Sequence, residues 1–298
     1  MDDEDRVREY LQWLAVERGR SRATLEAYRR DVRQFREWWN RPLDEVGPDT
    51  LEEFALVLRA RCAPASVARC LSSLRGFFSF LRDERLLASN PAERLHPPAR
   101  RRSLPKPLSE SDISLLIESV LPDDPVGRRD RALLELLYGT GVRVSEATGV
   151  NLSDLDFDED LLRVTGKGDK QRLVPLSSLV QRALRDYLGP GGRSNFPGAQ
   201  RHQRLFVNQR GGPLSRQGVD LIIAHRALYA GIDRSRVSAH VFRHSCATHM
   251  INHGADIRVV QELLGHASIS TTQTYTAVAL STLSDVYAHA HPRAQERT

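Results

Sequence analysis

The sequence predicts a mainly α-helical protein with a small antiparallel β-sheet, divided into an N-terminal helical bundle and a larger C-terminal domain. The chain has 298 residues, and at about 100–200 residues per domain this length suggests two domains. Apolar residues recur at helical spacing through residues 1–98 and through most of the remainder. Two β-favouring runs flank a glycine-rich turn within residues 161–176, a pattern typical of a hairpin.

Residues 1–98 are expected to form a bundle of four amphipathic helices joined by short turns. The first helix should end at Gly19, and the second should begin after Ser21, a residue type that caps helix N-termini well. Thr50 and Glu53 have the spacing of a capping box at the start of the third helix. The fourth helix is expected in "PASVARCLSSLRGFFSFLRDE".

Residues 99–107, "ARRRSLPKP", are expected to form an extended basic linker, because proline blocks helix formation. Residues 1–98 balance 17 arginines against 17 acidic residues, and residues 108–298 carry 22 basic and 21 acidic residues. Most of the net charge of +5 therefore lies in the linker. Four linker cations are candidates for contact with a DNA backbone: Arg100, Arg101, Arg102 and Lys106.

Residues 108–298 are expected to form the second domain, beginning with a helix that Ser109 and Asp112 cap. A further helix should end at the glycines of "YGTG". After the hairpin, helices are expected near 178–188, 215–230, 240–253, 256–264, around Tyr275 and near 280–289. The stretch 189–203, rich in glycine and proline, is expected to be a loop with little order.

The composition favours a cytoplasmic protein with a polyanionic partner. No apolar run approaches the ~18 residues needed to cross a bilayer, and the acidic start "MDDEDRVREY" has no apolar signal region. Cys62, Cys70 and Cys246 form no CxxC motif, which favours reduced thiols. An isoelectric point near 9.4 together with the basic linker points to nucleic acid. A basic linker that is simply exposed to solvent is the alternative explanation for the same charge.

Two cations near glycines in the second domain are suited to binding a phosphate. Arg143, in "GTGVRVSE", follows glycines that let a ligand approach the backbone, and its guanidinium can hold phosphate in a bidentate manner. Lys167, in "TGKGDKQR", lies at the expected hairpin turn, and its ammonium can donate a proton. It is one of three lysines beside 40 arginines, so its retention suggests a specific role. Charged surface residues remain the alternative for both positions.

The segment "SAHVFRHSCATHMINHG" places His240 and Arg243 on one face of a helix. Its two HxxxH pairs raise the possibility of zinc, but Val241 stands where an HExxH site needs glutamate and no nearby carboxylate completes the ligands. We therefore expect no metal and no cofactor. Packing, capping or surface roles are expected for the remaining histidines, His244, His249 and His253.

The segment "LLGHASISTTQTYT" supplies His266, directly after a helix-ending glycine, and Tyr275 nine residues later. A histidine beside a helix C-terminus and a half-buried aromatic are ordinary explanations for each. Five cations or proton carriers upstream of one tyrosine would together neutralise a phosphate without metal, and tyrosine attack would conserve the bond energy as a phosphotyrosine ester. The five groups are Arg143, Lys167, His240, Arg243 and His266.

These segments, in this order, resemble the conserved boxes of the tyrosine recombinase/integrase family. The likeness extends over essentially the whole chain, and the compact length and terminal "AHPRA" are most similar to the bacterial XerC/XerD subgroup. The resemblance implies a SAM-like N-terminal helical bundle that binds DNA and a tyrosine-recombinase catalytic domain.

The resemblance also implies a role for each site residue. Tyr275 would be the nucleophile, Lys167 the general acid that protonates the 5′-oxygen, and His240 a proton carrier that assists the tyrosine. The nonbridging oxygens of the phosphate would be held by Arg143, Arg243 and His266, while Glu146 would support the arginines.

The implied activity is site-specific recombination of double-stranded DNA through a 3′-phosphotyrosine link and a Holliday junction, resolving chromosome dimers at segregation. The implied assembly is a tetramer of this chain alone or with a paralogous Xer recombinase, answering to an FtsK-type translocase. The last helix would dock on a neighbouring protomer, although packing on its own domain is the alternative. Its apolar residues are Leu280, Leu283, Val286 and Tyr287.

Three other classes remain open from the residues alone. They are a type IB-like nicking-closing enzyme, a catalytically inactive DNA-binding protein and a metal-dependent nuclease. The complete set of six side chains favours recombination over a catalytically inactive DNA-binding protein. Loss of activity in EDTA would identify a metal-dependent nuclease.

Overall fold

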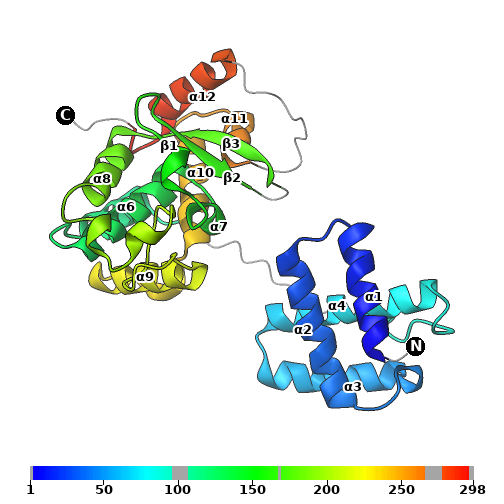
Figure 1. The fold of residues 1–298 in the computed structure, drawn as a ribbon. Helices are drawn as coiled ribbons and strands as arrows, with labels where there is room; N and C mark the ends of the chain where they lie inside the picture. Colours follow the sequence, from blue (N-terminus) through cyan, green and yellow to red (C-terminus); the bar gives the residue numbers. More distant parts are fainter. Residues whose placement is uncertain (1–2, 96–106, 167–168, 266–276, 295–298) are drawn as a thin grey trace. The chain divides into compact units, whose positions relative to one another are not determined.

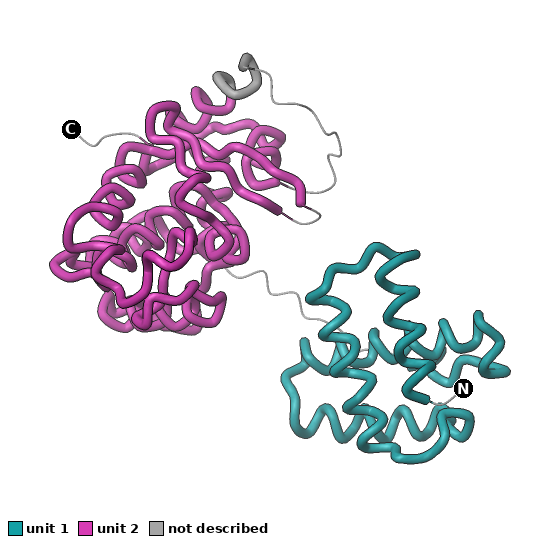
Figure 2. The backbone as a smooth tube through the Cα atoms, in the orientation of Figure 1, with its two compact units in different colours: residues 1–103 teal, residues 104–298 magenta. Residues whose placement is uncertain are grey.

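The computed structural model describes residues 3–95, 107–166, 169–265 and 277–294 (Figure 1). The chain forms two compact units, residues 1–103 and 104–298 (Figure 2). The described residues are mainly helical with one three-stranded sheet, so the predicted fold class is confirmed. The predicted domain limits at 98 and 108 stay predictions, because nearly all of the linker lies outside the described residues. Within the described ranges, no helix is long and apolar enough to cross a membrane.

The N-terminal unit is a bundle of four α-helices, as predicted. They are α1 (Asp3–Val16), α2 (Arg22–Trp39), α3 (Pro48–Arg61) and α4 (Pro64–Asp83), with a 3-10 turn η1 (Leu43–Glu45). Ser21 caps α2 as expected, because its hydroxyl accepts a hydrogen bond from the backbone N–H of Thr24. The cap predicted for α3 is wrong: the helix starts at Pro48, a residue favoured in the first turn, and the Thr50 hydroxyl accepts the N–H of Gly47.

Aromatic side chains fill the centre of this bundle. Phe35, Phe54 and Phe78 are almost completely buried. The ring of Phe35 meets Phe54 at 5.2 Å and Phe78 at 5.9 Å between centroids, both edge to face. These contacts join α2, α3 and α4, so the apolar stripes read from the sequence do face a common core.

The described residues of the C-terminal unit form eight α-helices, four short 3-10 turns and the sheet. The helices are α5 (Glu110–Glu118), α6 (Pro125–Thr140), α7 (Val144–Ala147), α8 (Ser178–Leu188), α9 (Arg216–Tyr229), α10 (Ala239–Asn252), α11 (Ile257–Leu264) and α12 (Ala277–Ala290). The short turns are η2 (Leu152–Asp154), η4 (Arg193–Asn195), η5 (Ala199–Arg201) and η6 (Arg234–Arg236). Most of these helices lie where the apolar periodicity predicts them, and Ser109 caps α5 through the N–H of Asp112 at 3.0 Å.

Helix α6 is the centre of this unit, with α8 and α10 packed against it (Figure 1). Its last nine residues, 132–140, are all buried. It ends at Gly141, whose φ of 59° is left-handed and where an added Cβ would lie 2.6 Å from a methyl of Leu264. Arg143 lies two residues after this tight turn.

The predicted hairpin is confirmed as strands β2 (Leu161–Thr165) and β3 (Gln171–Pro175), paired antiparallel. A third strand, β1 (Leu155–Asp156), extends the sheet and was not predicted, because two residues carry no alternation signal. In the register, Val164 lies opposite Arg172, and both face the interior of the unit.

The loop at 189–203 is ordered, contrary to expectation. The guanidinium of Arg193 is buried and donates to the carbonyl oxygens of Ala199, His202 and Arg204 at 2.8, 2.9 and 2.8 Å. One internal cation thus satisfies several loop carbonyls that glycine and proline content alone would leave without partners.

Helix α12 packs on its own unit through two of the residues expected to face a neighbouring protomer. Leu283 and Tyr287 are buried, and the Tyr287 hydroxyl donates to the Gly139 carbonyl oxygen at 2.7 Å. These two side chains therefore do not supply a docking surface in this structure, and docking by the rest of the helix stays a prediction.

Candidate active site

Three of the six predicted catalytic residues lie in the described part of the chain. Arg143 is the N-cap of α7, while His240 and Arg243 belong to the first turns of α10. The other predicted site residues lie outside the described residues: Lys167, His266, Tyr275 and the linker cations Arg100, Arg101, Arg102 and Lys106.

Arg143 is held by Glu146 and by the end of α11. Its backbone N–H donates to Glu146 Oε2 at 2.8 Å, and its Nη1 donates to Glu146 Oε1 at 2.8 Å. Its Nη2 donates to the carbonyl oxygen of Gly265 at 2.8 Å. The side chain is nevertheless 41% exposed, so the guanidinium is fixed in position and open to a ligand.

Arg243 approaches the same place from α10 and is buried. Its Nη1 and Nη2 donate to the carbonyl oxygens of Gly141 and Leu264, both at 2.6 Å. Burial, followed by the charge of Arg143, lowers the pKa of Arg243 to about 10. The two arginines that the sequence assigned to a phosphate are therefore brought together by the fold.

Arg172 is a third member of this site, and the sequence reading missed it. It is buried on β3, where Nη1 and Nη2 bind the two oxygens of Glu146, each at 2.9 Å. Its Nε donates to the carbonyl oxygen of Leu263 at 3.0 Å. The available signal was the alternation of β3, which places Arg172 on the same face as the buried Val174.

The guanidinium cluster, defined as Arg143, Arg172 and Arg243, closes the C-terminus of α11. Its members donate to three consecutive carbonyl oxygens, those of residues 263–265. The last carbonyls of a helix have no partners within the helix and carry partial negative charge, so cations stabilise them. The cluster thereby fixes the point in the chain that directly precedes His266.

The charge of the cluster exceeds that of its only carboxylate partner among the described contacts. Glu146 is 3% exposed, and burial alone would raise its pKa, but the hydrogen bonds and charge of Arg172 and then those of Arg143 hold the pKa below its usual range. Three cations around one anion leave a local surplus of two positive charges. Such a site is suited to an anion that also accepts several hydrogen bonds, such as a phosphodiester.

His240 is exposed at the start of α10, and the described residues give it no hydrogen bond to either predicted arginine. Two other histidines have ordinary roles, as expected. His249 is buried with its Nδ1 at 2.9 Å from the hydroxyl of Tyr138, and His253 lies 2.9 Å from Glu110. Within the described ranges, no group of three His, Cys, Asp or Glu side chains is placed to hold a metal ion.

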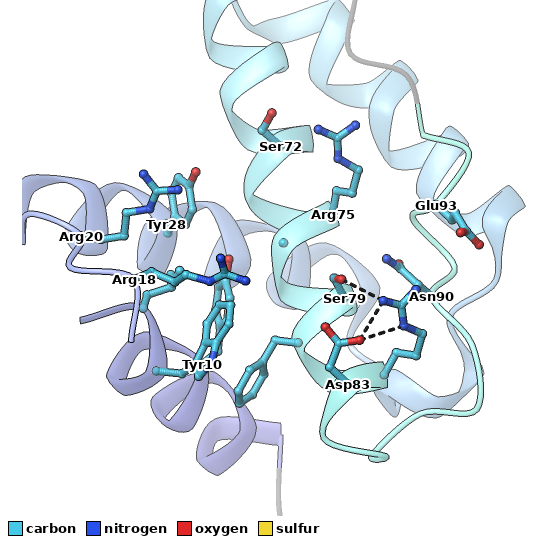
Figure 3. A pocket seen from close by; sticks show the side chains of 15 residues that line it. Tyr10, Arg18, Arg20, Tyr28, Ser72, Arg75, Ser79, Asp83, Asn90 and Glu93 are labelled. Atoms are coloured by element: carbon cyan, nitrogen blue, oxygen red, sulfur yellow. Dashed lines mark hydrogen bonds and ion pairs between the residues drawn. The ribbon is translucent and has the colours of Figure 1, made fainter. Parts of the chain in front are cut away.

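The N-terminal unit carries a second polar site, a pocket of about 510 Å³ between the end of α1 and the exposed side of α4 (Figure 3). Arg18, Arg20 and Arg75 line it, and Tyr28 and Ser72 add hydroxyl groups (Figure 3). A fourth arginine of the pocket is paired with Asp83. Sequence reasoning missed this pocket because its four arginines are among 40 in the chain and come from two separate segments, the α1–α2 connection and α4.

Comparison with known proteins identifies the class to which this fold and site belong. Residues 106–281 match the phage integrase family, and residues 7–85 match the phage integrase N-terminal SAM-like domain. The chain therefore belongs to the phage integrase family of tyrosine recombinases, which confirms the resemblance seen in its motifs.

The individual relatives narrow this class to the Xer recombinases. The chain is 43% identical to tyrosine recombinase XerD of Corynebacterium glutamicum over 298 residues, which covers 96% of this chain and 97% of that protein. It is 31% identical to the solved structure of XerA recombinase, with a TM-score of 0.50 and coverage of 98% and 100%. The structure of XerH bound to difH substrate before cleavage shares the fold at 22% identity, with a TM-score of 0.66 over 95% of this chain and 82% of XerH. The chain is thus a DNA recombinase of the Xer type.

Proposed function

We propose that Arg143 and Arg243 of the guanidinium cluster bind the scissile phosphate of a DNA recombination site and that Tyr275 attacks it. The surplus positive charge of the cluster, open to solvent at Arg143, is the observation that carries this proposal. A guanidinium has five N–H donors, and the described hydrogen bonds use two of those on Arg143 and two of those on Arg243. Both arginines therefore keep donors for the nonbridging oxygens of a phosphate.

The proposed chemistry is two transesterifications. The phenol oxygen of Tyr275 attacks phosphorus, a 3′-phosphotyrosyl bond forms, and the bond from phosphorus to the 5′-oxygen breaks. Lys167 gives its proton to the departing 5′-oxygen, and His240 takes the proton of the tyrosine. The freed 5′-hydroxyl of the partner strand then attacks the phosphotyrosine, which rejoins DNA as a Holliday junction and restores the tyrosine.

Stabilisation of the negative charge that develops on the phosphate is assigned to two arginines and one histidine. Arg143, Arg243 and His266 donate to the oxygens on which negative charge develops, in a site where hydrogen-bond donors are already oriented. No cofactor is assigned to this chemistry, and cleavage is expected to continue without metal.

Binding of double-stranded DNA is assigned to both units and to the linker. The pocket lined by Arg18, Arg20 and Arg75 and the four linker cations would contact backbone phosphates. Each phosphate contact releases counterions, so affinity should fall steeply as salt rises.

The proposed cellular role is resolution of chromosome dimers at segregation, in the cytoplasm where the chromosome lies. A tetramer on two DNA sites would carry it out, formed by this chain alone or with a paralogous Xer recombinase. An FtsK-type translocase is the proposed activator, and the exposed part of α12 is the proposed contact between protomers. The similarity to curated XerD proteins supports this assignment.

A nicked suicide duplex carrying a candidate dimer-resolution site tests the chemistry in the presence of EDTA. The native chain and the control Tyr229→Phe, which alters a tyrosine that is 69% exposed, should both form a covalent protein–DNA adduct. Tyr275→Phe should form none. An adduct that survives in Tyr275→Phe, or cleavage that requires added metal, would refute the proposal.

A second substrate pair separates recombination from nicking and closing. Two intact duplexes with the same site should yield a four-way junction, which is detected by its slower migration in a gel. Relaxation of supercoiled DNA with an adduct but no junction would assign the chain to a type IB-like enzyme instead.

A further inference from the structure

The carboxylate of Glu146 is shared between two arginines that have different surroundings. Oε1 accepts Nη1 of Arg143 at 2.8 Å and Nη1 of Arg172 at 2.9 Å. Oε2 accepts the backbone N–H of Arg143 at 2.8 Å and Nη2 of Arg172 at 2.9 Å. Arg172 is thus bound in a bidentate manner, whereas the guanidinium of Arg143 makes one contact with the carboxylate.

This sharing determines how much positive charge a phosphate would meet at Arg143. With Arg172 in place, the single negative charge of Glu146 neutralises one of the two guanidinium charges of Arg143 and Arg172. One positive charge therefore remains. Without it, Glu146 and Arg143 would form a neutral pair, and a carboxylate no longer held by β3 could draw the Arg143 guanidinium away from the open side. Because Glu146 is 3% exposed, water does little to screen this effect.

Arg172 also links three elements that precede or carry predicted catalytic groups. It belongs to β3 of the hairpin, it binds Glu146 of α7, and it donates to Leu263 at the end of α11. Its fit at α11 is close, because a Cβ on Gly265 would lie 3.1 Å from its Nη1.

We propose that Arg172 is a positioning residue for strand cleavage, which holds Glu146 so that the charge of Arg143 remains available to the scissile phosphate. The proposal rests on the function proposed above and adds a residue that touches neither DNA nor the reacting atoms. Arg172 acts through Glu146, and its effect is on the cleavage step more than on DNA affinity.

Single-turnover cleavage of the nicked duplex at saturating protein tests this role. Arg172→Gln should cleave about 100-fold more slowly than the native chain, comparable with loss of one preorganised donor, while its DNA affinity changes less than about threefold. Arg163→Gln is the matched control, because Arg163 is an exposed arginine on the neighbouring strand β2, and it should cleave at the native rate. Arg172→Lys keeps the charge without the bidentate geometry, so its cleavage rate should lie between those of Arg172→Gln and Arg163→Gln.

A methylphosphonate at the scissile position separates an electrostatic role from a purely structural one. This substitution replaces a nonbridging oxygen by methyl and removes the negative charge that Arg143 would neutralise. The ratio of native to Arg172→Gln cleavage rates should then fall from about 100 to less than about 5. An unchanged ratio on the two substrates would overturn the proposal.

The outcomes for Arg172 and for the proposed function are distinguishable. Absence of Tyr275-dependent cleavage by the native chain and by Arg163→Gln would refute the proposed function and the role of Arg172 with it. Native cleavage with Arg172→Gln within threefold of it would overturn only the role of Arg172. If Arg172→Gln does not fold, as judged by its thermal transition, Arg172→Lys is tested on the same two substrates, and an equal loss on both overturns the proposal.

Discussion

Replacement of Glu146 by glutamine is expected to destabilise the C-terminal unit strongly. The native carboxylate is 3% exposed and accepts four hydrogen bonds at 2.8–2.9 Å, three of them from the guanidinium groups of Arg143 and Arg172. Glutamine keeps the shape but loses the charge and turns one acceptor into a donor. Arg172 would then be a buried cation whose carboxylate partner is gone.

Removing one partner of a buried ion pair costs about 3–5 kcal/mol in free energy of unfolding. At roughly 2–4 °C of melting temperature per kcal/mol for a unit of this size, the midpoint should fall by roughly 6–20 °C. Glu118→Gln is the matched control, because Glu118 is 60% exposed and makes one ion pair with Arg293 at 3.2 Å. That substitution should cost less than about 1 kcal/mol.

Urea unfolding followed by circular dichroism measures both variants, with the midpoint and slope fitted separately. The free energy that Glu146 contributes should also depend on pH in a defined direction. Its pKa is lower in the folded chain than the ordinary value of 4.5, so the contribution is complete above pH 4.5 and is lost as pH falls through the folded pKa. A loss below about 1 kcal/mol at pH 7, or a loss that grows on acidification, would refute the buried-charge account.

Three further changes test other parts of the structure. Tyr138→Phe removes the buried 2.9 Å hydrogen bond to His249 and should cost about 1–2 kcal/mol in a urea titration; no change would mean that the bond contributes nothing. Gly265→Ala places a Cβ at a φ of 67° and 3.1 Å from Arg172, so it should lower stability by about 1–2 kcal/mol and also slow cleavage; native behaviour would contradict the packing described at α11. Replacing the four linker cations by glutamine should reduce the slope of log affinity against log salt by up to ~3.6, and an unchanged slope would exclude their contact with phosphates.

The sequence was most informative where one periodic face decides the structure. The helices of the N-terminal unit follow from apolar residues at helical spacing, with Phe35, Phe54 and Phe78 in the core that they form, and the hairpin follows from two β-favouring runs around glycines. The start of α3 was misplaced because a proline in the first turn and a glycine cap outweigh a threonine cap. The two-residue strand β1 depends on pairing with β2, which no local pattern encodes.

Buried polar contacts between distant segments were the least predictable part. Arg193 orders the loop at 189–203 from inside, and nothing in its sequence separates it from surface arginines. Arg172 is equally hidden among 40 arginines, and its role depends on Glu146 and Leu263, which lie 26 and 91 positions away. Arg143 and Arg243 were found from their local sequence patterns and from the resemblance of their motifs to a family, while the carbonyl groups that bring them together could be located only in the folded chain.

The central claim is that Tyr275 forms the covalent bond to DNA, and peptide mass spectrometry of the trapped adduct tests it most directly. The native chain is incubated with a nicked candidate site in EDTA, digested with protease and nuclease, and searched for a peptide that carries a 3′-linked nucleotide. The account predicts that the nucleotide is attached to Tyr275 in the peptide containing "STTQTYT". Attachment to any other side chain, or cleavage with no covalent peptide at all, would contradict it.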